Sequence, residues 1–312
     1  MTGPASHPAR VRIGCVQWQM REFASREALL RLVDQQVAAL ASYGCDFVLY
    51  PEFFTAPLLT LAPTLDTRRG MRALAGHSAA ISAAMAEMAV KYRVNLIAGS
   101  MPVLAGRRLF NVSYLCHRSG RIDHFAKLHP TPGERRDWAM RGGEHLQAFD
   151  TDCGRIGVLI CYDVEFPEAP RLLARQGVDI LFVPFWTDSR QGYQRVRFCA
   201  QARAIENECY VVLAGSVGCL PQAPCLDAQY AQSAVFSPSD FGFPHDAIVI
   251  EATANAETTL VCDLEPGRLQ ALRRQGSVRN GADRRDDLYE VRWRRPSGVP
   301  KKNTGRRGAP FG

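Results

Sequence analysis

One stretch of the sequence, residues 156–168, places a reactive side chain at the end of an expected buried strand. It reads I-G-V-L-I-C-Y-D-V-E-F-P-E, an apolar run that ends on Cys161 and is followed by polar residues. The apolar and β-branched composition of the run predicts a buried strand, and Pro167 predicts a helix start soon after it. In alternating α/β chains, clefts lie at the carboxyl ends of such strands, where free backbone N–H groups can stabilise an oxyanion. Cys161 is therefore the first candidate for a nucleophile.

The rest of the chain alternates strand-like and helix-like segments. Apolar and β-branched runs predict strands at 11–18, 46–50, 95–100, 178–184, 210–216, 234–237, 248–251 and 259–263. Apolar spacing predicts helices at 26–41, 78–92, 170–176 and 193–208, and a hairpin is predicted at 110–125. This order predicts an α/β fold in which a mixed, two-layered sheet is flanked by helices. Because no linker divides the chain before about residue 290, we expect an N-terminal extension (1–10), one domain (11–290) and a flexible basic tail (291–312).

The net charge of +7 resides in the expected tail rather than in the domain. Residues 291–312 carry seven basic and no acidic side chains, so the other 31 Lys and Arg residues balance the 31 Asp and Glu residues. A neutral domain does not favour nucleic acid as a partner. No apolar run approaches the roughly 20 residues of a membrane span, and the first ten residues lack the apolar core of a secretory signal. We therefore expect a cytoplasmic protein that does not enter a membrane.

The cysteines and histidines do not indicate a metal site or a disulfide framework. The ten cysteines form no C-x-x-C pair, and most lie within apolar runs, which is typical of small buried thiols. The seven histidines show no H-E-x-x-H or H-x-H spacing. We expect no bound metal.

Two other strand-like segments end in an ionisable residue that complements a cysteine nucleophile. Glu52 follows the apolar run 47–49 in Y-P-E-F-F, and Lys127 follows the hairpin in F-A-K-L-H-P. A thiol near neutral pH needs a base or a nearby cation to react, and a partly buried glutamate can act as that base. A lysine can lower the thiol pKa and stabilise an oxyanion. Glu52, Lys127 and Cys161 together are chemically sufficient for attack on an amide or nitrile carbon.

The order and local context of these three residues resemble the nitrilase superfamily of carbon–nitrogen hydrolases. Residues 11–17 resemble the first strand of that family, and the A-R-A-x-E-N pattern matches residues 202–207. The resemblance covers about residues 11–290 and implies a four-layer α-β-β-α sandwich that extends across a dimer. It also implies that no metal or organic cofactor is needed. We expect a homodimer or a higher homo-oligomer, and the helix at 193–208 then offers three candidate interface residues, Arg195, Arg197 and Phe198.

The resemblance implies a role for each matched residue. Glu52 would be the general base, Cys161 the nucleophile and Lys127 the stabiliser of the tetrahedral intermediate. The backbone N–H of Tyr162 would complete the oxyanion hole. Glu134 matches the second glutamate that positions the substrate or supports the lysine in many members. Its alternative is a surface ion pair with Arg135 or Arg136.

The residues after the nucleophile bear on the substrate. The C-Y-D motif at 161–163 is similar to amidase-like branches, whereas nitrilases tend to carry C-W-E, so an amide is favoured over a nitrile. Carbamoyl-amino-acid hydrolases commonly place arginines where this chain has Val164 and Glu165, which weakens that alternative. Glu165 leads to the hypothesis that the substrate pocket favours a neutral or cationic amide, such as an amine-bearing one. The alternative is that Glu165 forms a salt bridge with a helix arginine such as Arg171. Trp186 and Thr187 lie at the family's pocket wall, with rim packing as the alternative.

Other interpretations of the same residues stay open. A papain-like site would pair Cys161 with His129 or His245, but the flanking signatures of that class are missing. Asp163 is expected to orient the turn after Cys161, with His129 packed beside the active-site loop. Glu168 and Arg171 are expected to form an ion pair along a helix.

Two further hypotheses concern the chain as a whole. The run C-Y-D-V-E-F-P-E also resembles the hydrolase part of proteins fused to an acetyltransferase, and this chain would be a stand-alone form. A catalytically silent scaffold with the same fold would be expected to have lost one of the three catalytic positions, and all three are present.

Overall fold

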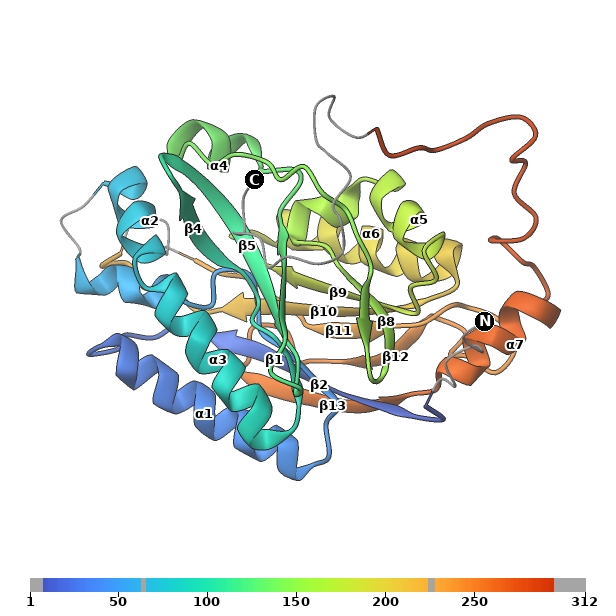
Figure 1. Cartoon of the computed structure of the whole chain (residues 1–312), viewed down its shortest axis with the longest axis horizontal. Coiled ribbons are helices and arrows are strands. Elements are labelled where there is room, and N and C mark those ends of the chain that lie inside the picture. The colour runs from blue at the N-terminus through green and yellow to red at the C-terminus, as the bar shows by residue number, and fades with distance from the viewer. Residues whose placement is uncertain (1–7, 63–65, 224–227, 295–312) are drawn as a thin grey trace.

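The strands form one continuous 13-stranded sheet that folds into two layers (Figure 1). The structure is a computed structural model, and it describes residues 8–62, 66–223 and 228–294. The first layer has the order β4-β5-β3-β2-β1, with β6 beside β5 and β13 beside β1. Its strands are β1 (Val11–Gln19), β2 (Phe47–Leu49), β3 (Asn95–Ile97), β4 (Met101–Ala105), β5 (Arg108–Cys116), β6 (Ile122–Ala126) and β13 (Thr258–Leu264).

The second layer continues from β1 through β10, β9 and β8 to β7. Its strands are β7 (Phe149–Thr151), β8 (Gly154–Val158), β9 (Ile180–Phe185), β10 (Tyr210–Val217), β11 (Ala234–Phe236) and β12 (Ile248–Glu251). The layers join where the ends of the parallel strands β1 and β10 meet, with Trp18 opposite Ser216 and Gln19 opposite Val217. Elsewhere the layers face each other, and the rings of Phe47 and Phe182 lie 5.2 Å apart between them.

Side chains of β1 alternate between two separate hydrophobic cores. Ile13 and Cys15 belong to the core between the sheet layers, whereas Val16 and Trp18 belong to the core beneath the first helices. The alternation follows from the period of two residues in a strand, and burial on both faces explains why the strand reads as almost continuously apolar.

Helices cover the outer face of each layer (Figure 1). The first layer is covered by α1 (Arg26–Ser42), α2 (Thr67–Ala75) and α3 (Ser78–Tyr92), with the short helix η1 (Ala56–Leu61) nearby. The second layer is covered by α5 (Glu168–Ala174) and α6 (Arg190–Asn207), whose Leu173, Val196 and Ala200 enter its core. The last helix, α7 (Pro266–Gln275), contributes Leu269 to the same core. The helix–sheet–sheet–helix order confirms the predicted four-layer sandwich, while its extension across a dimer stays a prediction.

Several predicted boundaries were wrong by a few residues. The strand expected through Ile160 ends at Val158, because Cys161 begins the short helix η2 (Cys161–Glu165). The helix expected at 170–176 is α5, which begins two residues earlier and ends at Ala174. Apart from residues 291–294, the expected tail lies outside the described residues, as do most residues of the expected N-terminal extension.

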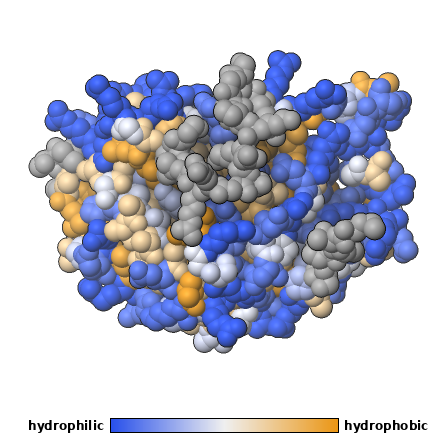
Figure 2. All heavy atoms as spheres, viewed as in Figure 1, coloured by the Kyte–Doolittle hydropathy of each residue, from blue (hydrophilic) through white to orange (hydrophobic). Residues whose placement is uncertain are grey.

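Hydrophobic residues gather over α3 on the face shown in Figure 2. The exposed apolar residues of this helix are Ala79, Ala83 and Val90. Within the described ranges, no single helix is long and apolar enough to cross a bilayer. Together α2 and α3 reach the required length and composition, but the chain bends by 44° between them. The inward face of α3, including Ile81 and Met85, is fully buried against the rest of the fold.

Candidate active site

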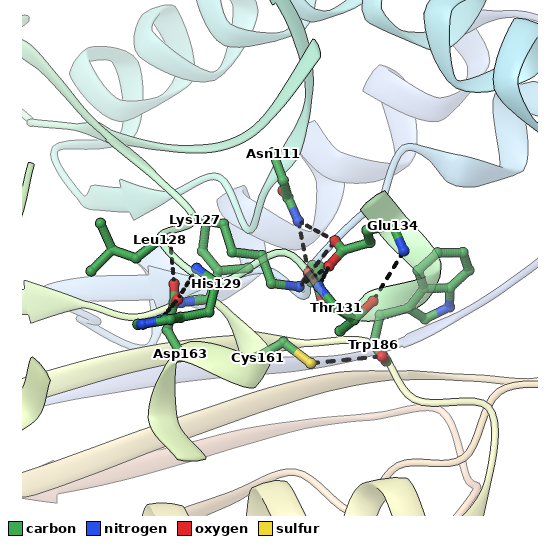
Figure 3. A network of polar contacts seen from close by, with 11 residues as sticks. Asn111, Lys127, Leu128, His129, Thr131, Glu134, Cys161, Asp163 and Trp186 are labelled. Carbon is green, nitrogen blue, oxygen red and sulfur yellow. Dashed lines mark hydrogen bonds and ion pairs between the residues drawn. The ribbon is translucent and has the colours of Figure 1, made fainter. Parts of the chain in front are cut away.

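Three strand ends bring the predicted catalytic side chains to one place. Glu52 lies three residues after β2, Lys127 directly after β6, and Cys161 three residues after β8. Glu134 joins them from α4 (Pro132–Asp137). Figure 3 shows Lys127 between Glu134 and Cys161. The site is thus assembled from both sheet layers.

Lys127 is fully buried and is bound by two carboxylates. Its Nζ lies 2.8 Å from Oε1 of Glu52, and 3.0 and 2.8 Å from the two carboxylate oxygens of Glu134. The side chains of Lys127, Glu52 and Glu134 are 1%, 2% and 5% exposed. A buried ammonium is tolerated only when its donors are paired, and here two carboxylates meet that need. The predicted alternative for Glu134, a surface ion pair, was wrong because Glu134 points inward to Lys127.

The charges of this network shift the acidities of its members. Burial raises the pKa of Glu52 to about 7, the attraction of Lys127 opposes the rise, and the negative charge of Glu134 adds to it. Burial lowers the pKa of Lys127, but the carboxylates of Glu134 and Glu52 outweigh burial and hold it well above its usual value. Lys127 therefore stays charged, while Glu52 exchanges a proton near neutral pH, as a general base must.

Two polar groups that the sequence analysis missed complete the network. Asn111, on β5, donates from Nδ2 to Oε1 of Glu52 at 2.7 Å and to Oε1 of Glu134 at 3.3 Å. Thr131 and Glu134 form a capping box at the start of α4, in which the Thr131 N–H donates to Oε2 of Glu134 at 2.6 Å. The signals were present in the sequence: a polar residue within a buried strand, and T-x-x-E before a helix.

Cys161 sits in a strained position at the turn after β8. Its φ of 49° lies in the left-handed region, which is costly for a residue with a Cβ and often marks a functional site. The thiol donates to the carbonyl oxygen of Trp186 at 3.8 Å, and the charges of Glu52 and Lys127 act on it. Burial, followed by the charge of Glu52, raises the pKa of Cys161 well above its usual value, and Lys127 opposes the rise. At neutral pH the sulfur of Cys161 is therefore protonated, with the carboxylate of Glu52 nearby.

Asp163 ties the turn after Cys161 to the loop after Lys127. Its fully buried carboxylate accepts backbone N–H groups of Leu128 (3.3 Å), His129 (2.8 Å) and Ile160 (3.2 Å). It also lies 2.8 Å from Nδ1 of His129, whose ring stacks on Phe166. The predicted role of Asp163 in orienting the turn is confirmed by these contacts, and His129 lies beside the loop as expected.

Replacing Asp163 with asparagine is expected to lower the free energy of unfolding by about 2 kcal/mol. The NH₂ group of the asparagine would replace one of the two acceptor oxygens and would face buried backbone N–H donors. The loss would be measured by urea denaturation. Asp150→Asn is the matched control: Asp150 is exposed and paired with Arg155, so its substitution should cost at most about 1 kcal/mol. Equal losses in the two variants would contradict a linking role for Asp163.

The comparisons with known proteins agree with this geometry. The family model described as carbon-nitrogen hydrolase matches residues 12–274. The chain belongs to the carbon–nitrogen hydrolase family. This confirms the predicted resemblance to the superfamily of carbon–nitrogen hydrolases.

Relatives and solved structures extend the comparison over most of the chain. A probable hydrolase of Bacillus subtilis, YhcX, is 40% identical over 285 residues, which are 91% of this chain and 56% of that protein. The chain therefore spans little more than half of that relative. The chloroplastic omega-amidase of Arabidopsis thaliana is 26% identical over 302 residues, 92% of this chain and 76% of that protein. A carbon-nitrogen hydrolase from Helicobacter pylori shares the fold, with a TM-score of 0.75 at 20% identity over 90% of this chain and 97% of that chain.

The other predicted pocket residues of this carbon–nitrogen hydrolase family member occupy different surroundings. Trp186 packs edge-on against Phe53, which follows Glu52, and stacks with Trp138 at the end of α4. The indole N–H of Trp186 is buried and finds no hydrogen-bond partner among the described residues. The hydroxyl of Thr187 donates to the carbonyl oxygen of Tyr230 at 2.8 Å. Trp186 is thus part of an aromatic cluster beside the site, whereas the Thr187 hydroxyl is engaged within the fold.

Glu165 lies at the end of η2, and its side chain is 18% exposed. Burial raises its pKa, and the charges of Arg195 and Lys127 oppose the rise. Its ion-pair partner is Arg195 of α6 at 3.8 Å, so Glu165 does pair with a helix arginine, although this is not Arg171, the example expected from the sequence. The reason is that α6 packs against η2, where Arg203 donates to the carbonyl oxygens of Val164 and Glu165. Among the described residues, no group of His, Cys, Asp or Glu side chains could hold a metal ion.

Proposed function

We propose that this chain hydrolyses the carbon–nitrogen bond of a small linear amide through a thioester on Cys161. Glu52 is the general base, and Lys127 stabilises the tetrahedral intermediate. The observation that carries the proposal is the buried contact of Lys127 with Glu52, beside a buried cysteine on which the charges of both residues act. A carboxylate with a pKa of about 7 next to a protonated thiol suits proton transfer during attack.

Acylation begins when the sulfur of Cys161 attacks the carbonyl carbon of the amide. Glu52 accepts the thiol proton as the C–S bond forms, and the carbonyl electrons move to oxygen. The Lys127 ammonium and the backbone N–H of Tyr162 stabilise that oxyanion. When the intermediate collapses, the C–N bond breaks, and the leaving nitrogen takes the proton from Glu52 and departs as ammonia or an amine.

Deacylation uses the same groups, with water as the nucleophile and the sulfur of Cys161 as the leaving group. Glu52 takes a proton from a water molecule, which attacks the thioester carbon. The C–S bond then breaks, the carboxylic acid leaves, and the sulfur regains its proton from Glu52. Glu134 contributes by fixing Lys127 and by positioning the substrate amide.

The substrate proposal rests on the nucleophile motif and on the relatives. The C-Y-D motif and the relative named as an omega-amidase favour an amide. A nitrile or an N-carbamoyl amine is the alternative within the superfamily, and a catalytically silent scaffold is the alternative outside it. We further propose a homodimer formed through α6, because the side chain of Phe198 is exposed there and lines an open groove with Arg195.

An ammonia-release screen over linear amides, carbamoyl compounds and nitriles tests the proposal. Short aliphatic amides are expected to release ammonia, and Cys161→Ala should reduce the rate to background. Pairs of amides with and without a terminal amine test whether Glu165 favours an amine-bearing substrate. The substitution Glu165→Gln should abolish that preference. Release from nitriles alone would favour the nitrilase alternative, and no release from any class would favour the silent scaffold.

A further inference from the structure

An open pocket of about 510 Å³ lies away from the candidate active site, between α5 and the segment that follows α7. That segment runs back past α5 (Figure 1) and is fastened there by Arg175, which lies 2.9 Å from Asp286 and 3.0 Å from the carbonyl oxygen of Val291. The pocket volume falls within the roughly 300–1,000 Å³ typical of small-molecule sites. Its polar lining consists of Arg171, Arg279, Arg284, Asn280, Asp283 and Tyr289.

Arg171 lines this pocket with an unpaired guanidinium. The expected ion pair with Glu168 was wrong, and within residues 8–62, 66–223 and 228–294 no side chain or carbonyl group forms a hydrogen bond or ion pair with the Arg171 side chain. Burial lowers the pKa of Arg171, the charge of Glu206 opposes this, and the charge of Arg284 lowers the pKa further. Among the described residues, no carboxylate lies within ion-pair distance of this partly buried guanidinium, while the like charge of Arg284 acts on it.

The other charges of the pocket do not supply that anion. Asp283 lies 2.9 Å from Arg279, and Arg284 lies 2.9 Å from Asp286, which also binds Arg175. The side chain of Arg284 is only 10% exposed, so its charge acts within the pocket rather than in bulk water. Three arginines against one aspartate leave the lining with an excess of two positive charges.

The remaining lining groups suit an organic ligand rather than a bare ion. Tyr289 and Val278 are more than half exposed and present apolar surface beside the arginines. Asn280 adds an amide that can donate a further hydrogen bond. A planar guanidinium binds the paired oxygens of a carboxylate or phosphate with two parallel hydrogen bonds.

We propose that this pocket binds a small organic anion, whose carboxylate or phosphate group pairs with Arg171 and Arg279 and whose apolar part packs on Tyr289. The site is separate from Cys161 and does not depend on the proposed reaction. An anion there would neutralise the mutual repulsion of Arg171 and Arg284 and join α5 to the C-terminal segment. Its binding should therefore stabilise the fold.

Isothermal titration calorimetry of the full chain with phenyl phosphate, benzoate and benzyl alcohol tests this proposal. One equivalent of at least one anion should bind, whereas the uncharged benzyl alcohol should not, and the stronger anion identifies the headgroup class. Arg171→Gln should weaken binding by at least about tenfold, since it removes charged hydrogen bonds. Arg31→Gln, at an exposed position of α1, is the matched control and should leave the affinity unchanged.

Thermal denaturation without ligand provides a second measurement. Arg171→Gln should melt no lower than the wild type, because no residue in the described part of the chain pairs with the guanidinium. A lower melting temperature would show that Arg171 makes a structural contact and would overturn the proposal. No binding of either anion, or equal weakening by Arg31→Gln, would also overturn it.

Discussion

Replacing Glu52 with glutamine is expected to lower kcat/KM for an amide substrate by about 10² to 10⁴, the usual contribution of a general base. Glutamine keeps an oxygen that can accept the hydrogen bonds from Lys127 and Asn111, so the fold should persist. It cannot take the proton of the Cys161 thiol. The measurement is the steady-state rate of ammonia release for both proteins, with circular dichroism as the check on folding.

The pH profile tests the same assignment independently. Glu52 must be ionised to act as a base, and its pKa is raised to about 7. The kcat/KM of the wild type should therefore rise with pH through this value, because the ionised fraction grows as pH increases. The residual activity of Glu52→Gln should lack that rise.

Thiol labelling separates loss of the base from loss of the site. Iodoacetamide should modify Cys161 more slowly in Glu52→Gln, whereas Cys219 is exposed and should react at the same rate in both proteins. A variant that retains activity within a factor of ten, or that still shows a rise near pH 7, would contradict the role of Glu52.

The sequence located the catalytic candidates because each is an ionisable residue directly after an apolar run. Such residues are anomalous there, and the superfamily resemblance brought Glu52, Lys127 and Cys161 together although 109 positions separate the first from the last. Asn111 escaped notice because its neighbours in β5 are apolar and nothing local marks which face of the strand it occupies. Its partners, Glu52 and Glu134, come from elements distant in sequence.

The expected ion pair of Arg171 with Glu168 was wrong, and Glu165 pairs with a different helix arginine from the one expected, for the same physical reason. Spacing along one helix led to the expectation that Arg171 would pair with Glu168, but it says nothing of chain segments that later pack on that helix. The segment after α7 packs over α5, and Arg171 lines the pocket between them. Glu165 likewise pairs with Arg195 because α6 lies against η2. Sequence periodicity predicts which side chains share a face of a helix, whereas tertiary packing decides which of the surrounding charged side chains they pair with.

Replacing Lys127 with methionine is expected to lower the free energy of unfolding by about 3 to 5 kcal/mol, the cost of leaving buried charges without their partner. Glu52 and Glu134 would face each other with only Asn111 between them. The activity should also fall by about 10² to 10³, because the proposed stabiliser of the oxyanion is lost. Lys91→Met is the matched control: Lys91 is exposed and paired with Asp34 at 3.1 Å, so its loss should cost at most about 1 kcal/mol.

The stability of Lys127→Met should depend on pH with a definite sign. The lysine opposes the rise in the Glu52 pKa, so its removal raises that pKa further above the unfolded value. A carboxyl group with a raised folded pKa stabilises the fold at low pH and loses that contribution as pH rises through the folded pKa. The deficit of the variant relative to the wild type should therefore be larger at pH 8 than at pH 5. A deficit that is independent of pH would mean that packing, rather than the two buried carboxylates, explains the loss.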